Sequence, residues 1–193
     1  MAPLKIGLTG GIAAGKSEAL KAFARLGAAT LSSDAVVHEL LESAPLRERL
    51  GERWGPEVIV AEGINRAKIG EIVFADPEEL SWLEEQIHPL VQEQTARWLL
   101  SLPAGTEVAV VEVPLLFEAG SDKAFDTTVA VVTGDEVRRE RAAARGHTLV
   151  DEREARQLTQ PEKAARAEHV VENDGSVEDL EQALSALLEK LRR

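Results

Sequence analysis

The chain has 193 residues, 44% of them hydrophobic and 29% charged, which is typical of one folded globular domain with room for an inserted subdomain. The absence of cysteine excludes disulfides and thiolate metal sites, and a net charge of −12 makes the chain a poor general binder of nucleic acid. The N-terminus has no signal-peptide pattern, and no apolar stretch approaches the roughly 20 residues that span a bilayer, so we expect a cytoplasmic protein without a membrane partner.

The first predicted element is a short buried strand at residues 4–8, and a complete phosphate-loop motif, G-x-x-x-x-G-K-[ST], follows it at residues 10–17. The motif leads into a predicted helix at residues 17–26, which Gly27 is expected to end. A strand, a glycine-rich turn and a helix N-terminus direct backbone N–H groups toward one phosphate-binding point. Lys16 can reach the β- and γ-phosphates, and the Ser17 hydroxyl can ligate Mg²⁺. The expected phosphate-binding residues are Gly11, Ile12, Ala13, Ala14, Gly15, Lys16 and Ser17.

A second short strand is predicted at residues 28–31, with Asp34 shortly after it. We expect this strand to run beside the first, with its carboxyl end facing the same crevice. Asp34 could then accept the proton of an attacking hydroxyl or hold that hydroxyl in line. It is an equally plausible N-cap for a helix over residues 35–41, and the two roles are compatible. Thr9 precedes the motif, where its hydroxyl either lies at the mouth of the site or simply ends the strand.

Near-continuous apolar runs predict buried strands at residues 108–113 and 127–132, and residues 169–172 predict a shorter last strand. Ser176 is expected to cap a final helix with leucines at helical spacing. This alternation predicts an α/β fold in which helices sandwich a parallel sheet. An acid near the end of the 108–113 run, Glu112 or Glu118, could bind the Mg²⁺ shell through water.

Two helical stretches interrupt the alternation. Residues 45–103 show three consecutive helical patterns and no convincing strand, so we interpret them as an insertion at the edge of the sheet. The three helices are predicted at residues 66–74, 77–86 and 89–100. Residues 135–166 are helical and rich in charge, and could form a hairpin over the phosphate loop.

Four arginines gather between residues 138 and 145 of this acidic chain. Arg141 and Arg145 lie four apart and share a helix face. Exposed arginines are often merely solvated, but beside a phosphate loop they could neutralise charge on a transferred phosphoryl group. His88 lies at a predicted helix start, where a lone histidine is more often structural, and the histidines do not have metal-ligand spacing.

Residues 8–17 resemble the opening of the dephospho-coenzyme A kinases. Further motifs of that family follow in the same order over nearly the whole chain: Asp34, Gly63-Ile64-Asn65-Arg66 with Val73-Phe74, His88-Pro89, Pro114-Leu115-Leu116-Phe117-Glu118, Arg141, Arg145, Gln157, Gln160 and Asn173-Asp174-Gly175-Ser176. Two positions depart from the family. Many members carry aspartate in place of Glu112, and many carry a further acid in place of Ser32, which makes Asp34 the only acid at that strand end.

The resemblance implies transfer of the γ-phosphate of ATP, with Mg²⁺, to the ribose 3′-hydroxyl of dephospho-coenzyme A, the last step of coenzyme A synthesis. It implies a phosphate-loop nucleotide-binding core at residues 1–44 and 105–193, a helical substrate domain at 45–104 and a lid at 135–166. The implied catalytic residues are Asp34, Lys16, Arg141 and Thr9. Arg145 and Asn173 would contact the nucleotide, and Ser17 with Glu112 would serve the metal. The implied substrate contacts are Asp34, Arg66, Phe74, His88, Leu115 and Gln157.

Three other functions compete with this one. Another small-molecule or nucleoside-monophosphate kinase would share the loop and the arginines and differ in its acceptor. A GTPase-like switch is disfavoured because the sequence has neither Asn-Lys-x-Asp nor Asp-x-x-Gly. A nucleic-acid-dependent ATPase is disfavoured by the acidic charge. The pattern indicates no oligomeric state.

Overall fold

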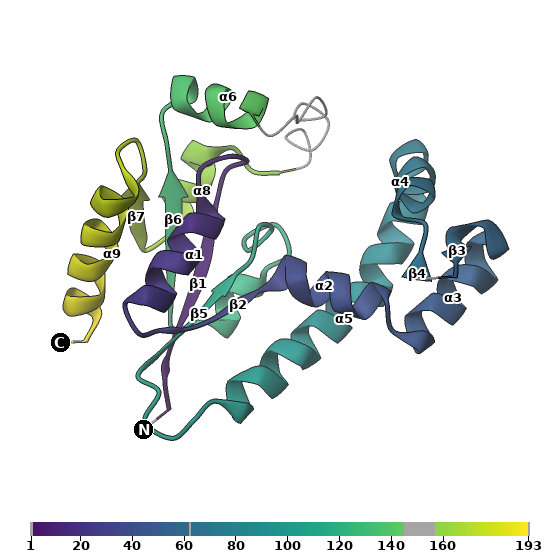
Figure 1. The fold of residues 1–193 in the computed structure, drawn as a ribbon, viewed down its shortest axis with the longest axis horizontal. Helices are drawn as coiled ribbons and strands as arrows, with labels where there is room; N and C mark the ends of the chain where they lie inside the picture. Colours follow the sequence, from purple (N-terminus) through teal and green to yellow (C-terminus); the bar gives the residue numbers. More distant parts are fainter. Residues whose placement is uncertain (1, 62, 145–156, 193) are drawn as a thin grey trace. The chain divides into compact units, whose positions relative to one another are not determined.

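The structure is a computed structural model that describes residues 2–61, 63–144 and 157–192. The chain divides into two compact units (Figure 1). We call Met1–Ser32 together with Leu102–Arg193 the core unit, and Ser33–Ser101 the helical unit.

Among the described residues, the core unit contains one parallel sheet of five strands in the order β2-β5-β1-β6-β7. The strands are β1 (Leu4–Gly10), β2 (Ala29–Ser32), β5 (Val108–Glu112), β6 (Thr127–Val132) and β7 (His169–Glu172). The predicted parallel sheet is therefore confirmed.

The expectation that β2 runs beside β1 is wrong, because β5 lies between them. Glu112 at the end of β5 is in register with Leu8 on one side and Ser32 on the other. Burial explains this order. All five residues of β5 are buried, whereas every residue of β2 is only partly buried, so β5 takes the interior position and β2 the edge.

One face of the sheet is covered by α1 (Lys16–Arg25) and α9 (Val177–Leu191), which pack side by side (Figure 1). Their apolar residues form one core with the strands, which includes Ile6, Leu8, Phe23, Val110, Val129, Val131, Leu180, Leu184 and Leu188. Gly27, with a φ of +87°, lies just past the end of α1, and Ser176 caps α9 through a capping box, as both were predicted to do.

The alternate residues of β1, Gly7 and Thr9, point to the opposite face. Helix α8 (Gln160–Arg166) contacts β1 and β6, and a short turn of 3₁₀ helix, η2 (Ser121–Ala124), lies between β5 and β6. Helix α6 (Asp135–Ala144) follows β6. The predicted helical stretch at 135–166 thus contains α6 and α8, and residues 145–156 between them lie outside the described residues.

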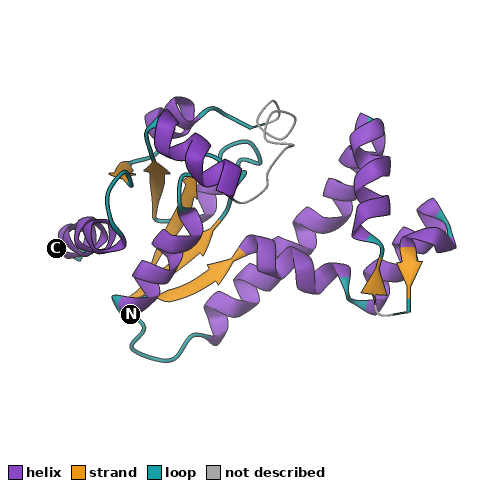
Figure 2. Cartoon of the chain, turned by 45° about the horizontal axis from the view of Figure 1, so that its top comes forward, coloured by secondary structure: helices purple, strands orange, loops and turns teal. Residues whose placement is uncertain are grey.

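In the helical unit, the long helix α5 packs against α2 and α4, while α3 packs against α2 and the short elements that follow it. The bounds are α2 (Ser33–Leu41), α3 (Ala44–Trp54), η1 (Pro56–Val58), β3 (Ile59–Val60), β4 (Gly63–Ile64), α4 (Arg66–Ala75) and α5 (Pro77–Ser101). Figure 2 shows β3 and β4 as a small antiparallel pair.

Three local predictions differ from this unit. The pattern predicts two helices where α5 is continuous through Pro89, and packing against α2 and α4 offsets the lost backbone hydrogen bond. The β3–β4 pair was missed because two-residue strands carry no measurable periodicity. Finally, α2 begins at Ser33, so Asp34 belongs to its first turn and is not its N-cap.

Candidate active site

The phosphate loop joins β1 to α1, and its backbone is closely packed. Gly15, at the N-cap of α1, has a left-handed φ of +97°. A Cβ atom added there would lie 2.0 Å from Nδ2 of Asn173, so only glycine fits without displacing a neighbour. Having no side chain, Gly15 cannot cap the helix. Its carbonyl accepts from the N–H groups of Glu18 at 3.0 Å and Ala19 at 2.9 Å, so α1 begins directly at the end of the loop.

Lys16 folds back over its own loop. Its Nζ donates to the carbonyl of Gly11 at 2.9 Å and to that of Gly10 at 3.2 Å. An ammonium group and the positive end of a helix dipole thus occupy the same few ångströms, which is the arrangement that attracts a phosphate. Ser17, the next residue, is exposed at the start of α1.

Asn173 connects this loop to the end of β7. It is buried, and its Nδ2 donates to the carbonyl of Ala14 at 2.8 Å. The backbone carbonyl of Asn173 accepts from Nη1 of Arg141 at 2.9 Å and from the Thr133 hydroxyl at 3.0 Å. The structure therefore brings together the phosphate loop and two residues predicted to lie near the nucleotide, Asn173 and Arg141.

Asp174 fixes the turn between β6 and α6, the helix that carries Arg141. Its Oδ1 accepts from the Thr133 hydroxyl at 2.7 Å and from the Gly134 N–H at 2.6 Å. The hydrogen bond from the Thr133 side chain, with that from the Gly134 backbone, holds the pKa of the Asp174 carboxyl below its ordinary value.

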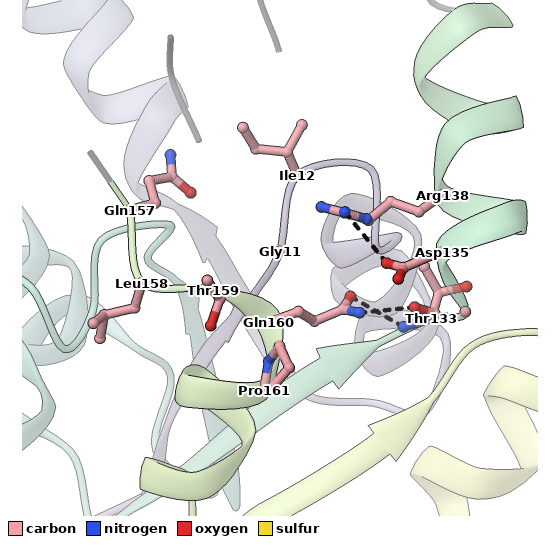
Figure 3. A pocket seen from close by; sticks show the side chains of 11 residues that line it. Gly11, Ile12, Thr133, Asp135, Arg138, Gln157, Leu158, Thr159, Gln160 and Pro161 are labelled. Atoms are coloured by element: carbon pink, nitrogen blue, oxygen red, sulfur yellow. Dashed lines mark hydrogen bonds and ion pairs between the residues drawn. The ribbon is translucent and has the colours of Figure 1, made fainter. Parts of the chain in front are cut away.

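A pocket of about 510 Å³ opens beside the loop (Figure 3). Its volume is in the range of small-molecule binding sites. It is lined by Gly11 and Ile12 of the loop, by the turn after β6, and by the segment that leads into α8. The other lining residues are Thr133, Gly134, Asp135, Arg138, Gln157, Leu158, Thr159, Gln160 and Pro161.

Gln160 holds the two sides of this pocket together. Figure 3 shows its amide pointing at Thr133, where it accepts from the backbone N–H at 3.1 Å and donates to the carbonyl at 2.7 Å. It also lies against the loop, since a Cβ atom added at Gly11 would be 3.2 Å from its Oε1. Gln157, a predicted substrate contact, lies on the same wall.

The remaining predicted residues of the core unit surround the loop. Thr9 is fully buried, and its hydroxyl donates to the Pro114 carbonyl at 3.3 Å. Glu112 is buried at the end of β5. Leu115 is half-buried in the turn that follows β5. Arg145 lies outside the described residues.

Four predicted residues belong to the helical unit and are exposed: Asp34, Arg66, Phe74 and His88. Within that unit, α2 and α4 are joined through Arg66. Its guanidinium donates to Nδ1 of His38 at 3.0 Å and to Oε1 of Glu42 at 3.1 Å. Asp34 is in the first turn of α2, where the helix dipole favours a negative charge.

A family model described as dephospho-CoA kinase matches residues 4–179. The dephospho-CoA kinase of Syntrophotalea carbinolica is 36% identical to the chain over an alignment of 196 positions, which covers 97% of this chain and 92% of that protein. This chain belongs to the dephospho-CoA kinase family.

Two solved structures have the same fold as this chain. The crystal structure of TT1252 from Thermus thermophilus has a TM-score of 0.83 and 36% identity, and the match covers 99% of each chain. The dephospho-CoA kinase from Campylobacter jejuni has a TM-score of 0.71 at 24% identity, covers 97% of this chain and 96% of its own, and supports the fold. The family resemblance drawn from the sequence motifs is thus confirmed.

Two properties of the described residues bear on ligands and surroundings. No group of three or more His, Asp or Glu side chains in this part of the chain could hold a metal ion. None of its helices is at once long and apolar enough to cross a bilayer.

The sequence analysis assigned no role to three residues that shape the site. Thr133 and Asp174 meet only because β6 and β7 are neighbours, and their spacing carries no motif. Lys163 is completely buried in α8, yet its surroundings in the sequence, Gln-Pro-Glu-Lys, resemble any solvated helix start. Asp174 belongs to a family motif quoted above, at residues 173–176, but was given no role there, and nothing indicated that Lys163 is buried.

Asp174→Asn should make the stability of the fold depend less on pH in the acidic range. A carboxyl whose pKa is lower in the folded state stabilises the fold above its unfolded pKa, near 3.8, and this contribution is lost as the pH falls through the folded value. We expect the variant to have a lower Tm than the wild type at neutral pH. The difference in Tm should disappear as the pH falls below the folded-state pKa of Asp174. Thermal melts across the pH range measure it, with the exposed neighbour Glu172→Gln as control. A gap that stays constant with pH would contradict this role.

Proposed function

We propose that the chain transfers the γ-phosphoryl group of ATP to the ribose 3′-hydroxyl of dephospho-coenzyme A, giving coenzyme A and ADP. The observation that carries the proposal is a closely packed phosphate loop in a chain that belongs to the dephospho-CoA kinase family. In the transfer, the bond between the 3′-oxygen and the γ-phosphorus forms and the bond from that phosphorus to the β,γ-bridging oxygen breaks. Since ATP is abundant in the cytoplasm, we propose that the reaction takes place in that compartment.

The triphosphate would lie along residues 11–17. Support comes from Lys16, whose ammonium already bridges two carbonyls of the loop, and from the start of α1 next to it. The ammonium of Lys16 and the positive end of the α1 dipole both lie at the phosphate loop, so this positive charge is in place before the phosphate binds. The pocket beside Gly11 and Ile12 offers space next to this point.

The residues fit a Mg²⁺ ion that takes most of its ligands from phosphate and water. Mg²⁺ is usually held by one or two protein oxygens together with substrate phosphates. Ser17 would supply a hydroxyl ligand, and Glu112 a carboxylate acting through water. When bound, the ion neutralises charge on the phosphate oxygens.

Arg141 is the candidate for neutralising charge on the transferred group. Its guanidinium lies next to the phosphate loop, because Nη1 would be 3.7 Å from a Cβ atom at Gly15. The Asn173 carbonyl holds it there. An arginine so placed stabilises the three equatorial oxygens more as charge develops on them. Arg145 would help to position the phosphoryl group, whereas the buried Thr9, whose hydroxyl donates to the Pro114 carbonyl, would act only through the position of the end of β1.

Asp34 is the candidate for receiving the proton of the ribose hydroxyl. It follows the carboxyl end of β2 by two residues, is exposed, and is in the first turn of α2. We assign acceptor binding to the helical unit with its Arg66, Phe74 and His88, together with Leu115 and Gln157. The segment at 135–166 would act as the lid that excludes water, and α8, which packs against β1 and β6, would anchor it to the core unit.

An acceptor panel tests the function. The purified chain, ATP and Mg²⁺ are offered dephospho-coenzyme A or a nucleoside monophosphate, and the products are identified by mass spectrometry. We expect ADP formation to depend on dephospho-coenzyme A, with the new phosphate on the ribose 3′-oxygen. Turnover of the mononucleotide but not of dephospho-coenzyme A would instead identify a different kinase of this fold.

Asp34→Asn removes the proposed proton acceptor but keeps the size of the side chain. We expect kcat to fall by roughly 10²- to 10⁴-fold, as for general bases, while the Kd for ATP changes little. Glu39→Gln makes the same acid-to-amide change at another exposed position of α2 and should be nearly silent. An unchanged kcat in Asp34→Asn would remove this residue from the mechanism.

Arg141→Ala should lower kcat by about 10³-fold and raise the KM for ATP much less, because the guanidinium acts mainly on the transition state. Steady-state kinetics with varied ATP separate the two constants. Arg139→Ala, an exposed residue of the same helix, is the matched control. If only KM rose, Arg141 would be a ground-state contact.

A further inference from the structure

Lys163 of α8 is a fully buried charge outside the residues assigned above. Its Nζ donates to the carbonyl of Pro114 and lies 3.1 Å from Oε1 of Glu118. The side chain of Glu118 is 17% exposed. A lysine and a glutamate from segments far apart in the sequence thus form one largely buried ion pair.

This ion pair is part of a wider polar network. Oε1 of Glu118 also accepts from the backbone N–H of Leu158 at 2.8 Å. The Pro114 carbonyl also accepts from the hydroxyl of Thr9, at the end of β1. The network therefore connects the end of β1, the turn after β5, the segment before α8, and α8 itself.

The network ends at the pocket wall. Leu158 lines the pocket beside the phosphate loop, as do Thr159 and Gln160 (Figure 3). Thr159 starts α8 through a capping box with Glu162, and Gln160 lies against Gly11. The placement of this wall next to Gly11 thus depends on where α8 and Leu158 are fixed.

Stability alone does not account for such a pair. Removing two charges from water costs about as much as their attraction returns, so replacing a buried pair with apolar residues is often neutral or stabilising. A pair of this kind instead restricts geometry, because each partner has few positions in which its charge is satisfied.

We propose that Lys163 and Glu118 are a positioning pair that holds the pocket wall at residues 157–160 against the phosphate loop. Neither residue touches the substrate. Their effect passes through Leu158 and Gln160 to the space in which the phosphoryl group is transferred. This role rests on the proposed function for its effect on turnover, but the placement of the wall is a property of the fold itself.

The test replaces both charges with their closest apolar isostere, in Lys163→Met combined with Glu118→Met. The double variant avoids the large destabilisation expected when one buried charge loses its partner. The matched control is Arg25→Met with Glu181→Met. This pair of the same unit joins α1 to α9 with an Nε–Oε2 distance of 2.6 Å, far along α1 from the loop.

Two measurements are made on each double variant. In hydrogen exchange without substrates, we expect the Leu158 amide to exchange at least about tenfold faster than in the control, because it has lost its acceptor. In steady-state assays, we expect kcat to fall at least about tenfold, with the KM for ATP within about threefold of the control. Tm should stay within about 5 °C of the control.

Other outcomes overturn the proposal. Wild-type exchange at Leu158, or a kcat within about twofold of the control, would mean that the pair does not position the wall. A large loss of Tm together with activity would mean that the pair holds the fold itself. A wild-type chain that does not turn over dephospho-coenzyme A would reject the proposed function, whereas the exchange result would still decide the role of the pair.

Discussion

The hydrogen bond from the side-chain amide of Asn173 to the backbone carbonyl of Ala14 is the contact on which the site depends. It ties the end of the last strand to the middle of the phosphate loop, between residues 159 apart in sequence. The left-handed Gly15 beside it leaves no space for a Cβ atom, so the backbone approaches the amide closely. Asn173 thus contacts both sides of the site: its side-chain amide packs against Gly15, and its backbone carbonyl accepts from Arg141.

The proposed anion site lies in a chain with a net charge of −12, and the short range of charge interactions in solvent makes the two compatible. At physiological ionic strength, charges more than about 8 Å apart in solvent are largely screened from each other. The ammonium of Lys16 and the start of α1 act within hydrogen-bonding range of the loop. Their field therefore dominates there, whereas the acidic residues of the remaining surface mainly oppose nonspecific binding of polyanions such as nucleic acid.

Features encoded locally were predictable, and those set by distant packing were not. The phosphate loop, the stop at Gly27 and the cap at Ser176 each follow from a few adjacent residues. The interior position of β5 depends on burial across the whole sheet, which no short pattern encodes. Lys163 lies in a segment that reads as solvated, and only the folded chain brings it to Pro114 and Glu118. The helix boundary predicted at Pro89 is wrong, because tertiary contacts of α5 outweigh the tendency of proline to interrupt a helix.

The helical unit is one uninterrupted segment between β2 and β5, and these two strands are neighbours in the sheet. The whole of Ser33–Ser101 is therefore an enlarged crossover connection. Lengthening a loop whose ends are already close costs only about 0.6 kcal/mol for each doubling. Natural variation can thus remodel or exchange this one segment, to which we assign acceptor binding as a proposal, without altering strand pairing in the core unit.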